Sequence, residues 1–143
     1  MSGRLLAVDW GERRIGLALS DESQTLAQPL TTLTRRPGKR FPMQRLLALL
    51  AEHAVRGVVV GLPLEADGSE GPPAGAARAL AADIAARSGL GVDLADERMT
   101  TARVLQTVRE MGGGTRGRKH EIDALAATLL LQQYLDTKRG GAT

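Results

Sequence analysis

The sequence contains no cysteine and very few aromatic residues: one Trp, one Tyr and one Phe in 143 residues. The absence of cysteine excludes disulfides and thiolate metal sites, and it suits an intracellular compartment. Three aromatic side chains are too few to make base stacking the main mode of any nucleic-acid binding. The core must therefore be built from Leu, Val, Ile and Ala.

Long apolar runs are also missing. No segment approaches the roughly 20 residues that a membrane-spanning helix needs, and the first residues lack the features of a secretory signal. We therefore expect a cytoplasmic protein with no membrane association. The formal net charge of +3 and the pI of about 9.9 mildly favour a polyanionic partner. The length suits one domain over residues 1–137, followed by a flexible tail over residues 138–143.

Apolar patterning predicts an α/β fold whose sheet begins with an antiparallel hairpin. The hairpin strands are expected at residues 4–10 and 15–20, and a third strand at 26–33 is placed at a sheet edge by Pro29. Short strands are then expected at 57–62 and 92–95. Helices are predicted at residues 42–55, 74–88, 100–111 and 121–135, an order typical of a mixed sheet covered by helices.

Three carboxylates occupy unusual positions in this pattern. Asp9 ends a strand that is apolar on both faces, and Glu97 follows the last predicted strand. Asp123 lies on the apolar side of the last predicted helix, in line with Ala126 and Ala127. Burying a single carboxylate in such places is costly unless another group compensates its charge.

A shared site explains all three positions. Ligands of open α/β sheets gather outside the carboxyl ends of parallel strands, and a divalent cation relieves the repulsion between carboxylates that meet there. Oxygen ligands without cysteine favour Mg²⁺ or Mn²⁺. Two-metal nucleases hold their ions in this way beside a substrate phosphate. We therefore predict a metal-dependent phosphodiesterase with Asp9, Glu97 and Asp123 as catalytic and metal-binding residues.

Each carboxylate considered alone also has a plain structural interpretation. Asp9 would suit a turn or a helix cap, and Glu97 would suit a solvated or salt-bridged position. Asp123 could form an ion pair with Lys119, four residues earlier. Only the occurrence of all three favours a catalytic site over these alternatives.

Four ordered segments resemble the YqgF/RuvX family of small ribonuclease-H-like proteins, which are related to the RuvC Holliday junction resolvases. The segments are VDWGERRIGLALSD, VVVGLPLEADGSEG, DERMTT and KHEIDALAATLLLQQYL, and together they span nearly the whole chain. The resemblance implies a ribonuclease-H-like fold with helices on both faces of a mixed sheet. It also implies a hydrolase that trims the 5′ end of the pre-16S rRNA in ribosome biogenesis and whose cleavage leaves a 5′-phosphate and a 3′-hydroxyl.

The resemblance assigns the acidic site to Asp9, Glu97 and Asp123, and we expect Asp9 to bridge two metal ions. His120 departs from the family pattern, which has Lys in many relatives. This histidine is a candidate metal ligand or proton carrier, and a solvated surface position is the alternative. Further residues near the site are candidates for holding substrate phosphates: Arg13, Arg14, Arg98, Thr100, Arg116, Arg118 and Lys119.

Other functions remain open at this point. A Holliday junction resolvase acting on branched DNA in recombination and repair would need two symmetric sites, and hence a homodimer rather than a monomer. A non-catalytic RNA-binding assembly factor of the small ribosomal subunit would bind the precursor without cleaving it. An actin-like or sugar-kinase-like nucleotide binder normally needs two domains, for which this chain is too short.

Overall fold

The computed structural model describes the backbone of residues 3–10, 14–34, 41–97 and 119–140. Within the last of these ranges, it describes the side chains of residues 124–138. The predicted helix at residues 100–111 therefore lies outside the described residues.

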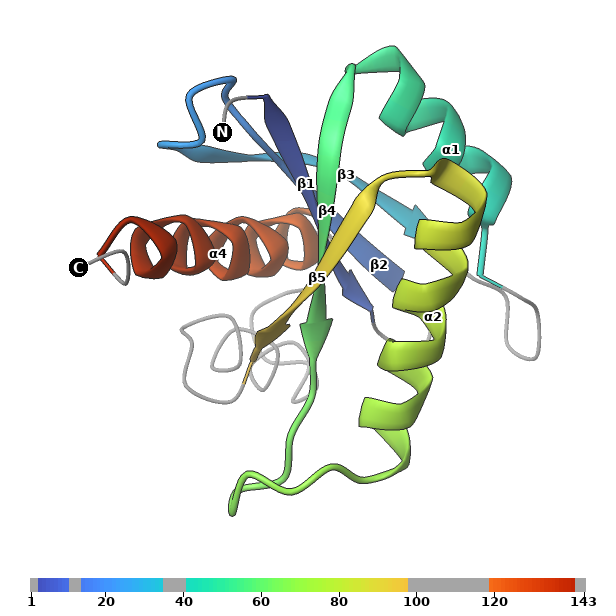
Figure 1. Cartoon of the computed structure of the whole chain (residues 1–143), viewed down its shortest axis with the longest axis vertical. Helices are drawn as coiled ribbons and strands as arrows, with labels where there is room; N and C mark the ends of the chain where they lie inside the picture. Colours follow the sequence, from blue (N-terminus) through green and yellow to red (C-terminus); the bar gives the residue numbers. More distant parts are fainter. Residues whose placement is uncertain (1–2, 11–13, 35–40, 98–118, 141–143) are drawn as a thin grey trace.

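The described strands form one mixed sheet in the order β3-β2-β1-β4-β5 (Figure 1). β1 pairs antiparallel with β2, and β2 with β3, whereas β1 and β4, and β4 and β5, are parallel. The N-terminal hairpin is thus confirmed, and Pro29 lies in β3, an edge strand of this sheet. The strand bounds are β1 (Arg4–Trp10), β2 (Arg14–Ser20), β3 (Ala27–Thr34), β4 (Val55–Leu62) and β5 (Gly91–Asp96).

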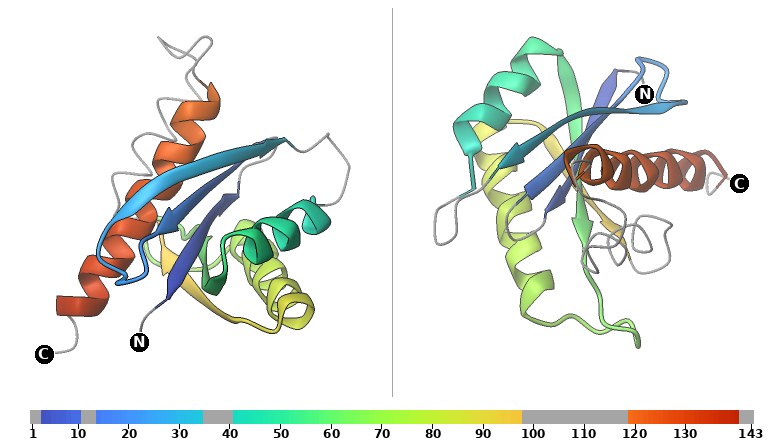
Figure 2. Two further views of the ribbon diagram at one scale, coloured as in Figure 1. Left: turned by 90° about the horizontal axis from the view of Figure 1, so that it is seen from above. Right: turned by 180° about the vertical axis from the view of Figure 1, so that it is seen from behind.

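Helices cover both faces of this sheet, as Figure 2 shows. On one face, the helices α1 (Met43–Glu52) and α2 (Pro72–Ser88) pack against Leu6 and Val8 of β1. On the other face, α4 (Lys119–Gly140) packs against Leu5 and Ala7. Because alternate residues of a strand point to opposite faces, β1 is apolar on both. This arrangement confirms the predicted fold class.

The bounds of α1 and α2 differ from the prediction. α1 ends at Glu52, because Ala54 adopts a positive φ of 51° and the chain then enters β4 at Val55. Pro42 precedes this helix as its N-cap. α2 begins earlier than predicted, at Pro72, since proline suits the first turn of a helix, where backbone N–H groups need no partner within the helix.

The last helix is longer than predicted. α4 runs from Lys119 to Gly140, whereas the sequence predicted a helix over residues 121–135. The Lys138 ammonium lies 5.5 Å from the centre of the Tyr134 ring, one helical turn earlier, and this cation–π contact stabilises the added turn. Residues 141–143 lie outside the described residues. No described helix is long and apolar enough to cross a membrane.

Candidate active site

Asp9 is buried on the face of the sheet that α4 covers. Leu5 and Ala7 belong to the apolar cluster beneath α4, whereas Trp10 packs into the cluster on the opposite face. The alternation of side chains along β1 therefore turns Asp9 toward α4. Its side chain is only 3% exposed, and its Oδ2 atom is shielded from solvent.

Glu97 reaches the same face from the end of β5. Its backbone N–H donates to the carbonyl of Leu62 at 3.2 Å, which fixes the chain as it leaves the strand. Its carboxyl group lies directly over Gly61 of β4: a Cβ atom added at Gly61 would overlap the carboxylate and lie 2.7 Å from Cδ. Glu97 is only 6% exposed. Glu97 can keep this position only with a glycine at residue 61, because its carboxylate occupies the space of a side chain.

The register of the sheet places Asp9 and Glu97 at one edge. Val8 of β1 is level with Val60 of β4, so the next step along these parallel strands brings Asp9 level with Gly61. Neighbouring strands lie about 4.8 Å apart. Both carboxylates therefore lie at the carboxyl ends of parallel strands, on one face, as the sequence predicted.

Asp123 lies in the part of α4 that approaches this edge. Ala126, one turn after Asp123, clusters with Ala95, which is level with Gly61. Farther along the helix, Tyr134 donates a hydrogen bond to Asp93 near the start of β5. α4 thus runs from the carboxyl edge toward the amino edge of β5, and the backbone of Asp123 stands beyond Ala126 on the carboxyl side.

The other predicted site residues are described only in part. Arg14 begins β2 directly before Ile15, the partner of Trp10, so it lies at the same end of the hairpin as Asp9. The side chains of Lys119, His120 and Asp123 lie outside the described residues. The remaining candidates lie wholly outside them: Arg13, Arg98, Thr100, Arg116 and Arg118.

The described donors fit a hard divalent cation. Within the described side chains no group of three potential ligands is complete, but Asp9 and Glu97 supply two buried carboxylates on one face. Two such charges are costly to bury without a compensating cation. The Glu97 carboxylate occupies the space above Gly61, and the chain has no thiol that could serve as a ligand. Oxygen donors of this kind suit Mg²⁺ or Mn²⁺.

Gly61 is the site residue that sequence reasoning missed. A glycine at the end of a buried strand often marks the close approach of another group, and Gly61 in VVVGL is such a position. The sequence could not show that the approaching group is the side chain of Glu97, which comes from a different strand end.

The sheet and its helices define a ribonuclease-H-like protein. Two solved structures of RuvC from Thermus thermophilus share this fold. The structure of RuvC with a Holliday junction substrate gives a TM-score of 0.55 at 18% identity, covering 96% of each chain. A second RuvC structure gives a TM-score of 0.54 at 17% identity, with the same coverage.

The chain belongs to the RuvX family, described as Holliday junction resolvase, whose model matches residues 3–137. A relative from Chloroflexus aggregans is 42% identical over 135 residues, which is 94% of each chain. Another, from Paramagnetospirillum magneticum, is 40% identical over 139 residues, covering 97% of this chain and 89% of the relative. Both carry the name "Putative pre-16S rRNA nuclease". The resemblance seen in the sequence is thereby confirmed.

Proposed function

We propose that this protein is a metal-dependent nuclease that hydrolyses phosphodiester bonds of the 16S rRNA precursor and matures its 5′ end in the cytoplasm. The observation that carries the proposal is the burial of Asp9 and Glu97 on one face at the carboxyl ends of parallel strands. The names of the relatives support the choice of substrate.

Asp9, Glu97 and Asp123 would hold the metal ions, and His120 is a further candidate ligand. Mg²⁺ or Mn²⁺ ions, when bound, supply an activated water for attack on phosphorus and stabilise the departing oxygen. The buried position of Asp9 and Glu97 serves this chemistry, because electrostatic interactions strengthen where water is excluded.

Basic residues around the carboxyl edge would hold the substrate. Arg14 lies at the hairpin end next to Asp9, where its guanidinium can contact a phosphate. Phosphate contacts orient the strand without reading its sequence, so we expect substrate choice to depend on RNA shape. We expect the same role for Arg13, Arg98, Thr100, Arg116, Arg118 and Lys119.

A direct comparison of two substrates tests the proposal. A 16S precursor with its 5′ extension and a four-way DNA junction are incubated side by side with the protein and Mg²⁺ or Mn²⁺. We expect cleavage within the 5′ extension that leaves a 5′-phosphate and a 3′-hydroxyl. The pattern of intermediates then distinguishes endonuclease from exonuclease action. Intact precursor with both metals would contradict the proposal.

A second candidate is a Holliday junction resolvase, favoured by the family description and by the RuvC-like fold. It requires two sites related by a two-fold axis, so it predicts a homodimer that nicks the junction symmetrically. A third possible result of the assay is tight binding of the precursor without cleavage of either substrate. This result would indicate a non-catalytic assembly factor.

A further inference from the structure

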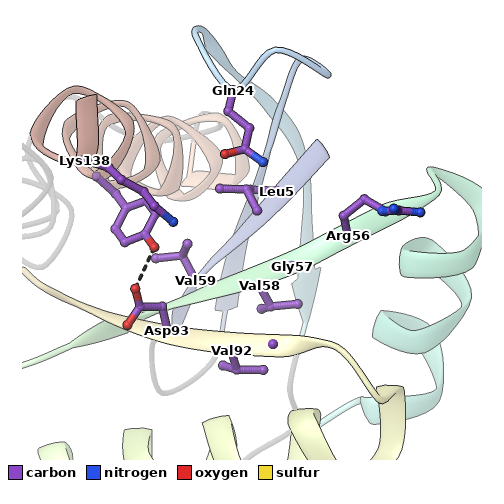
Figure 3. A pocket seen from close by; sticks show the side chains of 11 residues that line it. Leu5, Gln24, Arg56, Gly57, Val58, Val59, Val92, Asp93 and Lys138 are labelled. Atoms are coloured by element: carbon purple, nitrogen blue, oxygen red, sulfur yellow. Dashed lines mark hydrogen bonds between the residues drawn. The ribbon is translucent and has the colours of Figure 1, made fainter. Parts of the chain in front are cut away.

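A cavity lies at the opposite end of the sheet from Asp9 and Glu97. It has a volume of about 470 Å³ and opens between the amino ends of β1, β4 and β5 and the last turns of α4 (Figure 3). This size falls within the range of small-molecule sites. Leu5, which lines it, precedes Asp9 by four residues, about 13 Å along the strand. The cavity is thus separate from the candidate active site.

Two glycines lie side by side at the base of this cavity, and the space above one of them is open. Gly57 of β4 and Gly91 of β5 are directly level with one another, and Leu5 of β1 is level with Gly57. A Cβ atom added at Gly91 would meet no atom within 4 Å, so the space above it is open. A Cβ at Gly57 would lie 2.9 Å from Leu5 Cδ2. Leu5 therefore covers Gly57, and the open backbone at Gly91 lies beside this apolar side chain, an arrangement that suits one face of a planar ring.

Polar groups line the cavity on the side of α4. The Tyr134 hydroxyl donates a 2.6 Å hydrogen bond to Asp93 Oδ2, and Asp93 Oδ1 accepts the N–H of Leu94 at 3.0 Å. Each carboxylate oxygen retains capacity to accept a further hydrogen bond. Asp93 can therefore accept a hydrogen bond from an amino group on a ligand ring.

Two cations flank the cavity. Figure 3 shows Lys138 and Arg56 on opposite sides, with Leu5 and Gly57 between them. Among the residues that the structure describes, neither cation forms an ion pair with a carboxylate. Lys138 is held over the Tyr134 ring. Lys138 can therefore attract an anionic group of a ligand, whereas the Arg56 guanidinium points away from Leu5 and Gly57 in Figure 3.

We infer that this cavity binds a nucleoside monophosphate. The base lies on the open backbone at Gly91, against Leu5, and donates a hydrogen bond to Asp93, and the phosphate contacts the ammonium of Lys138. An apolar acid would offer no hydrogen-bond donor to Asp93. An inorganic anion would leave the open space above Gly91 unfilled. The inference does not depend on the proposed nuclease activity.

The only tyrosine of the chain provides the readout. Tyr134 lines the cavity, so the ring signals of tyrosine-labelled protein report binding in NMR spectra without further assignment. The full chain is titrated, in metal-free buffer, with AMP, GMP, CMP and UMP. Parallel titrations use adenosine, inorganic phosphate and a short oligoribonucleotide. We expect a saturable shift with at least one mononucleotide, weaker binding of its nucleoside and no saturation with phosphate alone.

Three variants decide the outcome. Gly91→Leu fills the open space above Gly91, and we expect it to weaken nucleotide binding by about tenfold or more, or 1.4 kcal/mol. Gly75→Leu is the matched control, because Gly75 also has open space around it but lies on α2, away from the cavity. Lys138→Gln keeps this space and should reduce nucleotide affinity to that of the nucleoside, which tests the inference even if Gly91→Leu fails to fold.

The inference is overturned if no mononucleotide shifts the tyrosine signals in a saturable way. It is also overturned if a folded Gly91→Leu variant binds as the wild type does, or if Lys138→Gln leaves nucleotide affinity unchanged. Binding of the oligoribonucleotide but of no mononucleotide would equally contradict it. Because the titrations contain no metal and no cleavable precursor, these results are independent of the outcome of the nuclease assays.

Discussion

The carboxylate of Glu97 occupies the space that a side chain at position 61 would need. This contact joins the end of β5 to the end of β4. Because Gly61 is level with Asp9 of β1, the contact places the buried Glu97 carboxylate close to Asp9 along the sheet. The candidate site therefore depends on Gly61, a residue that has no functional side chain.

Gly61→Ala tests this relationship. The added methyl group overlaps the Glu97 carboxylate, so the acid must move, and we expect loss of cleavage together with destabilisation of about 1–3 kcal/mol. Urea unfolding and a cleavage assay measure the two effects. Gly75→Ala is the matched control: its added methyl group meets open space in α2, so we expect unchanged activity and slightly higher stability. Wild-type cleavage by the Gly61→Ala protein would show that activity does not depend on the contact between Gly61 and Glu97.

Much of the fold could be predicted from the sequence because alternation along a strand is a local property. The first strand was predicted with its observed bounds, and Pro29 correctly indicated an edge strand. The end of α1 could not be predicted, because Val55 continues the apolar pattern although it already belongs to β4. The turn between them depends on a positive φ at Ala54, a conformation that alanine rarely adopts.

The positions of two candidate site residues were also predictable. Asp9 and Glu97 meet at one edge because the carboxyl ends of parallel strands do so in any such sheet. The contribution of Gly61 arises only when two strands are side by side, so the sequence did not show it. The roles of Asp9, Glu97, Asp123, His120 and all the basic residues stay predictions.

Divalent cations should stabilise the protein. A ligand that binds only the folded state raises the melting temperature, so we expect Mg²⁺ or Mn²⁺ to raise it and to support cleavage. Ca²⁺ should bind but support little cleavage, because its looser coordination positions the phosphate poorly. Thermal melts and cleavage assays with each ion make the comparison. Full activity in excess EDTA would exclude the metal mechanism.

The salt dependence of RNA binding tests the basic residues before Asp123. Replacing Arg116, Arg118 and Lys119 together by Ala removes up to three phosphate contacts, which should weaken binding and reduce the slope of log K against log salt by about 2–3. Metal-induced stabilisation should survive. Binding titrations at several salt concentrations measure the slope, and an unchanged slope would show that these residues do not contact the phosphate backbone.

The bond between Tyr134 and Asp93 predicts a dependence of stability on alkaline pH. Burial, together with the hydrogen bond to Asp93, raises the pKa of Tyr134 to about 12. Because the folded state holds this proton more tightly than the unfolded state, whose pKa is about 10, the stabilisation is complete below pH 10. It is lost as the pH rises toward 12.

Titration of the near-ultraviolet absorbance of tyrosinate checks this directly, since the chain has one tyrosine. We expect Asp93→Asn to lower the midpoint, because the carboxylate no longer opposes ionisation. Tyr134→Phe should destabilise the protein by about 0.5–1.5 kcal/mol at neutral pH. Identical midpoints for the wild type and Asp93→Asn would show that the bond does not form in solution.

The substitution Asp9→Asn tests the central claim most directly. It removes a buried negative charge while keeping the size of the side chain, so the metal-free protein should keep or gain thermal stability as repulsion is relieved. The measurement is the single-turnover rate of 5′-end cleavage of the 16S precursor with Mg²⁺ or Mn²⁺. Asp83→Asn, which removes an exposed carboxylate from α2, serves as the control. We predict a folded Asp9→Asn protein with no detectable cleavage beside a fully active control; substantial cleavage by folded Asp9→Asn would contradict the account.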